Sequence, residues 1–243
     1  MFRFAPLAWL ALVFGYWMAM TVISFIPYVG VVAASVLIPA FSVGFMAASR
    51  AAEGRLPLEL SNLGAGFRDH VGAQIALGAV YFAAIAALLA ATALADGGTL
   101  ARWMSTGERP SPEVLASDEF LRALLVSAVL YVPVMMAFWF APVLVAWHGL
   151  SAVKALFFSF FASLINWRAF LAYGAGAAIV LFILPAAVAL GAMLLSGGTA
   201  RTVLLSAMLP FLLMLLPTLF ASFYASYRDV FGGREEPPAE KQQ

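Results

Sequence analysis

The sequence predicts an all-α polytopic membrane protein with six transmembrane helices, arranged as three parallel-repeat hairpins with cytoplasmic interfacial helices. The first observation is composition: 64% of the 243 residues are hydrophobic, 10% are charged, and the mean hydropathy is +0.99. Soluble chains are about 45–50% apolar and about 25% charged, so this chain lacks the polar residues that a water-facing surface needs. The other two observations are a set of long apolar runs and a bias of cations toward alternate connections.

Each apolar run is long enough for a transmembrane helix, which needs about 20 predominantly apolar residues. No run contains an interior charge except for Arg122, whose side chain lies at the mouth of the fourth run and can extend to the headgroups. The first run is longer than the hydrophobic region of a signal peptide, about 7–15 residues, so we expect it to remain as a helix. The six expected spans cover 6–26, 28–48, 71–95, 121–147, 170–195 and 202–225.

The distribution of Lys and Arg predicts the orientation of these spans. Cytoplasmic connections of membrane proteins carry an excess of cations, and nine of the 13 cations fall on the side that holds both termini. We therefore expect both termini in the cytoplasm, with 229–243 as a disordered cytoplasmic tail. The nine are Arg3, Arg50, Arg55, Arg68, Lys154, Arg168, Arg228, Arg234 and Lys241, and the other four are Arg102, Arg109, Arg122 and Arg201.

Two connections have clear local signals. The uncharged turn 26–28 predicts that the first two helices form a tight hairpin. Residues 96–120 form the one sizeable extracytoplasmic loop, in which Arg109-Pro-Ser-Pro112 favours extended chain or a turn. Ser117-Asp118 is typical of an N-cap and predicts the start of the fourth helix.

Two cytoplasmic connections are too apolar for ordinary loops. In 149–166, apolar residues recur at helical spacing while Ser159, Ser163 and other polar residues fall on the opposite face. This pattern favours a helix in the membrane interface over a seventh span, which would place the C-terminal tail outside. The segment 58–68 shows the same pattern more weakly, and the alternative of an ordinary connection stays open for it.

The chain also resembles itself. Pro39–Arg50 aligns without gaps to Pro217–Arg228, and Pro142–Lys154 repeats the pattern with one extra residue, so we expect a mid-helix proline above a cytoplasmic cation each time. An aromatic-arginine pair precedes each odd-numbered span, at 2–3, 67–68 and 167–168. The third and fifth spans are also followed by the same sequence, Gly-Gly-Thr, at 97–99 and 197–199. A triplicated hairpin explains these matches, although caps and interface anchors also recur by common physics.

Chemical groups are scarce in the spans. His70 and His148 are the two candidate general bases, and both lie at the ends of helices, where a histidine more commonly neutralises the helix terminus. Two histidines without a carboxylate cluster do not make a zinc or di-iron site. The chain has no cysteine, and its net charge of +1 gives no field that gathers nucleic acid. We expect no catalytic residue, no cofactor, no metal site and no nucleic-acid partner.

The stretch Asp96-Gly-Gly-Thr-Leu-Ala-Arg102 resembles the opening Asp-Gly-x-x-Ala-Arg motif of the CDP-alcohol phosphotransferases, whose aspartates bind a divalent metal. Its spacing is one residue too long, and the downstream Gly-x-x-x-Asp-x-x-x-Asp motif is absent. The segment also faces the wrong side of the membrane for a nucleotide substrate. We therefore favour a helix that ends in a glycine cap, with Arg102 and Trp103 at the interface.

The stretches 6–9, 37–50, 96–98 and 166–170 together resemble an uncharacterised proteobacterial inner-membrane family that is labelled after a Burkholderia locus. The resemblance covers nearly the whole chain, and Pro39–Arg50 is its most specific part. Members usually have a longer basic, aromatic-rich N-terminus, so we expect this chain to be truncated there or to lack the first interfacial helix. The resemblance implies a Gram-negative cytoplasmic membrane and brings neither an activity nor site residues.

The hypothesis that follows is a non-enzymatic inner-membrane protein whose interfacial helices engage membrane lipids, another membrane protein or a second copy of the chain. The alternative is a small-molecule or lipid transporter that uses the proline-broken even-numbered helices. The prolines within spans are Pro39, Pro133, Pro142, Pro185, Pro210 and Pro217.

Gly174 and Ala178 offer a small-residue face on the fifth span, which favours packing of this helix within the bundle.

Overall fold

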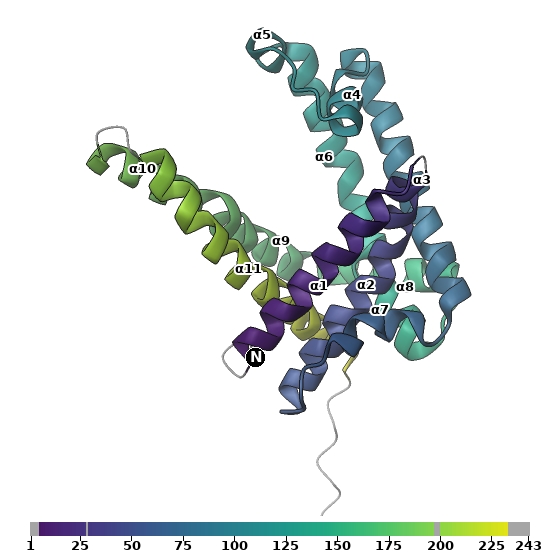
Figure 1. Ribbon diagram of the computed structural model, residues 1–243. Helices are drawn as coiled ribbons and strands as arrows, with labels where there is room; N and C mark the ends of the chain where they lie inside the picture. Colours follow the sequence, from purple (N-terminus) through teal and green to yellow (C-terminus); the bar gives the residue numbers. More distant parts are fainter. Residues whose placement is uncertain (1–4, 28, 197–199, 233–243) are drawn as a thin grey trace, which may run out of the picture. The chain divides into compact units, whose positions relative to one another are not determined.

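The computed structural model describes residues 5–27, 29–196 and 200–232, and all regular structure in these ranges is helical (Figure 1). The predicted all-α class is therefore confirmed. The helices are α1 (Pro6–Ser24), α2 (Gly30–Glu53), η2 (Leu60–Phe67), α3 (Val71–Asp96), α4 (Thr99–Thr106), α5 (Pro112–Leu115), α6 (Asp118–Phe138), α7 (Ala141–His148), α8 (Ala152–Ile165), α9 (Trp167–Ala178), η3 (Ile179–Ile183), α10 (Leu184–Ser196) and α11 (Ala200–Phe231).

Within the described ranges, 5 helical stretches are long and apolar enough to cross a membrane. Each of them overlaps one of the first five expected spans. The sixth expected span, 202–225, falls inside α11, most of whose side chains lie outside the described residues. This set of apolar helices fits a membrane protein. The 5 stretches are Pro6–Ser24, Val32–Glu53, Val71–Asp96, Asp118–His148 and Trp167–Val188.

The chain divides into two compact units. Unit 1 comprises residues 1–17, 44–63 and 167–243, and unit 2 comprises 18–43 and 64–166. The boundaries cut α1 and α2, so each of these helices contributes to both units.

Unit 2 is built on the hairpin of α3 and α6, which pack along each other. Gly78 of α3 lies against the α2 backbone, because a Cβ added to Gly78 would be 1.9 Å from the carbonyl oxygen of Val36. One turn along α3, the ring of Tyr81 packs edge to face on Phe138 of α6. A close backbone contact with α2 and an aromatic contact with α6 thus both hold α3 in place.

A helical cap closes one end of this hairpin, where we expected a loop at 96–120. Gly97 ends α3 in the left-handed conformation, at φ 65°, as the expected glycine cap requires. The chain then forms α4 and α5, and the residues between these two helices, 107–111, have no helical structure. The prediction of extended chain or a turn at 109–112 therefore agrees with the structure for 109–111, whereas Pro112 begins α5. Beneath α4, Leu100, Phe120 and Ala123 form a buried cluster against which Ala95, Trp103 and Leu115 pack.

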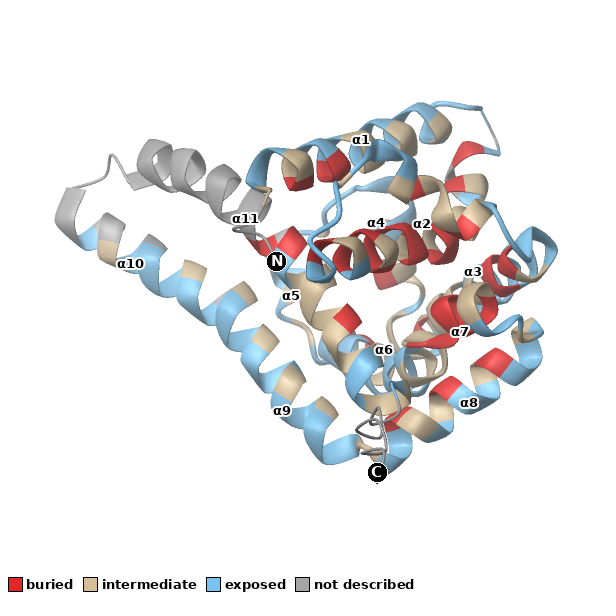
Figure 2. Ribbon diagram, turned by 90° about the horizontal axis from the view of Figure 1, so that it is seen from below, coloured by how far each residue is buried: buried red, intermediate tan, exposed pale blue. Residues whose placement is uncertain are grey.

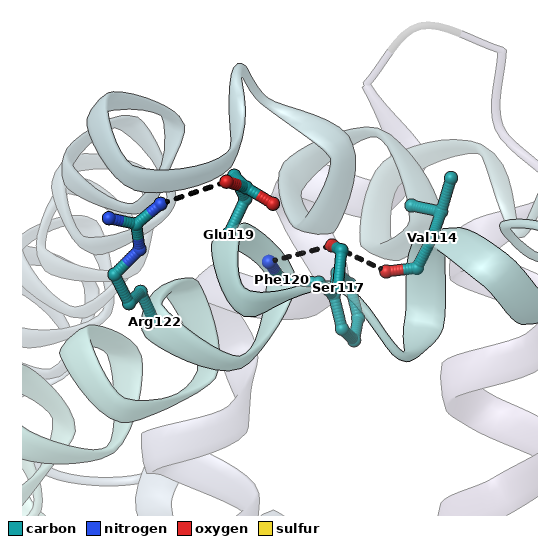
Figure 3. Close-up of polar contacts among 5 residues, drawn as sticks. All are labelled: Val114, Ser117, Glu119, Phe120 and Arg122. Carbon is teal, nitrogen blue, oxygen red and sulfur yellow. Dashed lines mark hydrogen bonds and ion pairs between the residues drawn. The ribbon is translucent and has the colours of Figure 1, made fainter.

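The predicted N-cap of the fourth helix is confirmed, since α6 begins at Asp118 with Ser117 as its cap. Figure 3 shows that the Ser117 hydroxyl lies between two backbone groups: it accepts from the Phe120 N–H at 3.2 Å and donates to the Val114 carbonyl at 2.8 Å. It therefore ties the start of α6 to the end of α5. Arg122 and Glu119 form an exposed ion pair at 3.1 Å beside it.

The expected span 121–147 is interrupted. Its helix ends at Phe138, and α7 begins at Ala141 after a break at Trp139-Phe140. Pro142 is consequently in the first turn of α7 rather than in mid-helix, so the expected mid-helix position was wrong for this proline. With 21 residues, α6 alone is about 31 Å long, which matches a hydrocarbon core of about 30 Å.

The segment 58–68 also differs from the expected α-helix, because Leu60–Phe67 forms a 3-10 helix. Glycines explain its close packing on α2. In unit 1 a Cβ on Gly44 would be 2.7 Å from the Leu63 backbone, and in unit 2 a Cβ on Gly66 would be 2.2 Å from the Ala40 carbonyl oxygen. A side chain at either glycine would therefore push this short helix away from α2.

Unit 1 contains the end of α2 together with α9, η3, α10 and α11. Phe45 of α2 stacks on Phe220 of α11 at 3.9 Å between ring centroids. Near the ends of these helices, the Glu53 carboxylate accepts hydrogen bonds from the Tyr224 hydroxyl, at 2.7 Å, and from Arg228. Segments 39–50 and 217–228, which we aligned as repeats, therefore lie on two helices that pack on each other.

The fifth expected span, 170–195, is not one continuous α-helix. Ile179–Ile183 is a π-helix, in which the Leu184 N–H bonds to the Ile179 carbonyl, directly before Pro185. Figure 2 shows α9 and α10 exposed over most of their described surface. Within the described residues, a Cβ added to Gly174 would have no neighbouring atom within 4 Å, so the predicted packing role of this glycine is not seen there. The helix α11 continues to Phe231, so the start of the disordered tail at 229 was wrong, and 197–199 and 233–243 lie outside the described residues.

Candidate functional site

The polar groups buried in the middle of unit 2 lie at the break between α6 and α7. In an unbroken helix the Phe140 N–H would donate to the Met136 carbonyl four residues earlier. Here the hydroxyl of Ser159 on α8 takes both roles, since it accepts from the Phe140 N–H and donates to the Met136 carbonyl, each at 2.9 Å. A side chain from another helix thus satisfies the two backbone groups that the break frees.

Two further side chains support this junction. Ser163, one turn along α8, also donates to the Met136 carbonyl at 3.2 Å. From the opposite side, Gln74 Nε2 of α3 donates to the Pro142 carbonyl at 2.7 Å, and this glutamine is 1% exposed. Side chains from α3 and α8 thus meet at the break between α6 and α7.

Contacts with α3 place α7 at the start of that helix. Near the first end of α7, the Pro142 carbonyl accepts from Gln74, and at the other end a Cβ on Gly149 would be 3.1 Å from His70 Nε2. Both ends of α7 thus lie near the first turn of α3.

Helix α8 packs on α6 and α7, and both views show it crosswise to α6 (Figures 1 and 2). Its buried residues are Ala155, Ser159 and Ser163, which face the junction. The side that faces away is apolar except for the exposed Lys154. We call this side the outer face of α8, and its large residues, between 42% and 78% exposed, are Val153, Phe157, Phe158, Phe161, Leu164 and Ile165.

The orientation of α8 is the feature that the sequence did not reveal. We had grouped Ser159 and Ser163 as the polar face of an interface helix, but the structure buries both against backbone. The available signal was their spacing: Ala155, Ser159 and Ser163 recur every four residues and so form one narrow face of small side chains. Small residues at that spacing favour close packing with another helix in a membrane.

The candidate chemical groups lie at helix ends. His70 adopts the left-handed conformation, at φ 55°, directly before α3, and His148 is the last residue of α7. Asp96 Oδ1 and Oδ2 accept from the N–H groups of Gly98 and Leu100, so this carboxylate caps α4. Among residues 5–27, 29–196 and 200–232, no group of three or more His, Cys, Asp or Glu side chains is arranged to hold a metal ion.

The sequence of this chain is similar to that of a known inner-membrane protein. The chain is 41% identical to a protein of Burkholderia thailandensis named "Probable inner membrane protein", over 99% of this chain and 90% of the relative. The chain belongs to this inner-membrane family. The predicted resemblance is confirmed, and together with the apolar helices it identifies an integral inner-membrane protein. No family model and no solved structure matches the chain.

Proposed function

We propose that this protein is a non-enzymatic inner-membrane protein that engages the lipids of the cytoplasmic leaflet through the outer face of α8. The observation that carries the proposal is the reversed polarity of this helix. Its serines bond to backbone inside the protein, and six large apolar side chains face outward.

Energetics favour lipid around this face. Each large apolar side chain gains roughly 1.5–3 kcal/mol when it leaves water, so six of them exposed to the cytosol would be strongly unfavourable. α8 packs directly on α6, whose Val129, Val132 and Met135 are also exposed and apolar. The spanning helix next to α8 thus also presents apolar side chains outward. Lys154, the one charge on α8, is exposed and can extend to the headgroups.

The position of the titratable groups supports a non-enzymatic role. Catalytic groups inside membranes are expensive polar residues that face a bundle interior or a cavity. Here His70 and His148 lie at helix ends and Asp96 binds two backbone N–H groups. The buried Gln74, Ser159 and Ser163 of unit 2 are instead uncharged and serve the helix break.

Depth measurement by spin labelling tests the proposal, and the absence of cysteine makes single-cysteine variants straightforward. Phe161→Cys places a nitroxide on the outer face of α8, and the control Ser105→Cys places one on the exposed side of α4. In vesicles, we expect collisions with oxygen to dominate at 161 and collisions with a water-soluble nickel chelate to dominate at 105. Preferential nickel access at 161 would overturn the proposal, and protection from both reagents would replace lipid by a protein partner.

A second candidate function is small-molecule or lipid transport, and Gln74 favours it. Its Oε1 is buried without a hydrogen-bond partner within the described part of the chain, beside a broken helix of the kind that binds substrates in transporters. Single cysteines at Pro39, Pro142 and Pro217 would react with an impermeant thiol reagent if a water-filled path reached these positions. Uniform protection of all three would contradict transport along that path.

A further inference from the structure

We infer that the α7–α8 pair acts as a one-sided wedge. The protein should therefore prefer curved membranes in which the leaflet that contains α8 is the outer, expanded leaflet. The inference rests on the proposed function, because it requires α8 to lie in lipid. It adds a property that lipid contact alone does not imply, namely a response to membrane shape.

The first step is the placement of the pair at one end of the α3–α6 hairpin. Gln74 and His70 hold α7 at the first turn of α3, and Ser159 holds α8 at the last turn of α6. Since α6 alone spans a hydrocarbon core of about 30 Å, both short helices lie near one boundary of that core. They therefore occupy one leaflet.

The second step is the area that the pair adds to this leaflet. With 14 residues, α8 is about 21 Å long and about 10 Å wide, a footprint on the order of 200 Å². Lipid must move aside for it, because its outer face is apolar and the helix lies crosswise to the spanning helix α6 (Figures 1 and 2). Helices that insert in this way bind in a curvature-sensitive manner, since they expand one leaflet only.

The third step is the absence of equal compensation at the other end of the described part of unit 2. The short helix there, α4, turns Leu100 inward and exposes Arg102, Ser105 and Thr106 together with one large apolar side chain, Met104. With one such side chain against six on α8, it adds much less area among the acyl chains of the opposite leaflet. The asymmetry between the two ends produces the wedge.

Lateral sorting on membrane tubes tests the inference. The full chain, carrying a fluorophore at Ser105→Cys, is reconstituted in giant vesicles from which tubes are pulled, and an impermeant quencher reports which side holds α4. When α4 is luminal, α8 lies in the expanded outer leaflet, and we expect a tube-to-vesicle density ratio above one. In the opposite orientation the ratio should fall below one. Equal densities in both orientations would overturn the inference.

A pair of matched double variants isolates the contribution of α8. Phe157→Ser with Phe161→Ser makes the outer face polar, and we expect sorting to be lost in both orientations. Phe82→Ser with Leu125→Ser removes exposed apolar side chains from the spanning helices and should leave sorting unchanged. Equal sorting by both double variants would also overturn the inference. If nitroxide at 161 reports lipid while sorting is absent, the wedge fails and the proposed lipid contact stands; if 161 reports water, both fail.

Discussion

Two short helices, α4 and α8, pack on opposite ends of the α3–α6 hairpin, and their polar and apolar faces are oriented in opposite ways. α4 turns Leu100 and Trp103 inward and leaves its polar side chains outside. α8 turns Ser159 and Ser163 inward and leaves phenylalanines outside. The difference teaches that the inner face of a short helix is set by what it covers: α4 covers a small apolar cluster, and α8 covers two backbone groups freed by a helix break.

The outer faces then follow from the solvent at each end. A helix that uses its polar groups internally and exposes its apolar ones is stable only where the surroundings are apolar. Because α8 has this arrangement and α4 the reverse, the hairpin carries a lipid-compatible end and a water-compatible end. The comparison can therefore be tested by substituting the inner and outer faces separately.

Replacing the inner apolar residue of α4 should have the largest effect. Leu100 is 4% exposed, so Leu100→Ala should destabilise the protein by about 2–5 kcal/mol through lost burial and a residual cavity. The matched change on α8 is Phe161→Ala, which removes a larger but exposed side chain and should cost less than about 1 kcal/mol. Reversible unfolding in bicelles measures both. Equal losses would mean that α8 buries its phenylalanines against protein.

Replacing the inner polar residue of α8 should have the next largest effect. Ser159→Ala removes the hydroxyl that accepts from the Phe140 N–H, and the loss of a buried hydrogen-bond partner costs about 1–3 kcal/mol. Ser163→Ala is the control, because the Met136 carbonyl keeps its bond from Ser159, and we expect a smaller loss. The same unfolding assay ranks the two variants. An unchanged stability of Ser159→Ala would show that the break is satisfied without this hydroxyl.

The cap of α4 should have a smaller effect. Asp96→Ala removes the acceptor of two N–H groups at the first turn of α4, and loss of a helix cap costs about 0.5–2 kcal/mol. Hydrogen exchange of the 99–106 amides measures the local change. Glu108→Ala, at an exposed position just beyond α4, serves as the control and should leave the exchange rates unchanged. Faster exchange in both variants would point to a general charge effect.

These substitutions also show which features a sequence can predict. The Ser117 cap and the Gly97 helix end were predictable because both depend on backbone groups within four residues. The apolar spans were predictable because lipid requires a long uninterrupted run. In each case the partner of the residue is either its own helix or the solvent.

The inward orientation of Ser159 was not predictable in this way. Its partners, Met136 and Phe140, lie 23 and 19 residues away and became available only because the helix ends at Phe138. Pro142 indicated a weak point in that helix, but it did not show that the break would precede the proline or that α7 would turn aside. The polarity of α8 therefore depended on a tertiary contact that periodicity along one helix does not contain.

Acid should loosen the α4 end of unit 2 slightly, through a carboxyl group just beyond α4. Beyond α4, a hydrogen bond from the Ser111 hydroxyl lowers the pKa of Glu113 in the first turn of α5. A carboxyl whose pKa is lower in the folded than in the unfolded state stabilises the fold above the unfolded pKa, and this contribution disappears as the pH falls through the folded pKa. We therefore expect a small acid-induced loosening of 112–115, measurable by NMR titration of Glu113. Ser111→Ala should return the pKa of Glu113 toward its ordinary value, and identical titrations of the two proteins would show that this hydrogen bond does not control it.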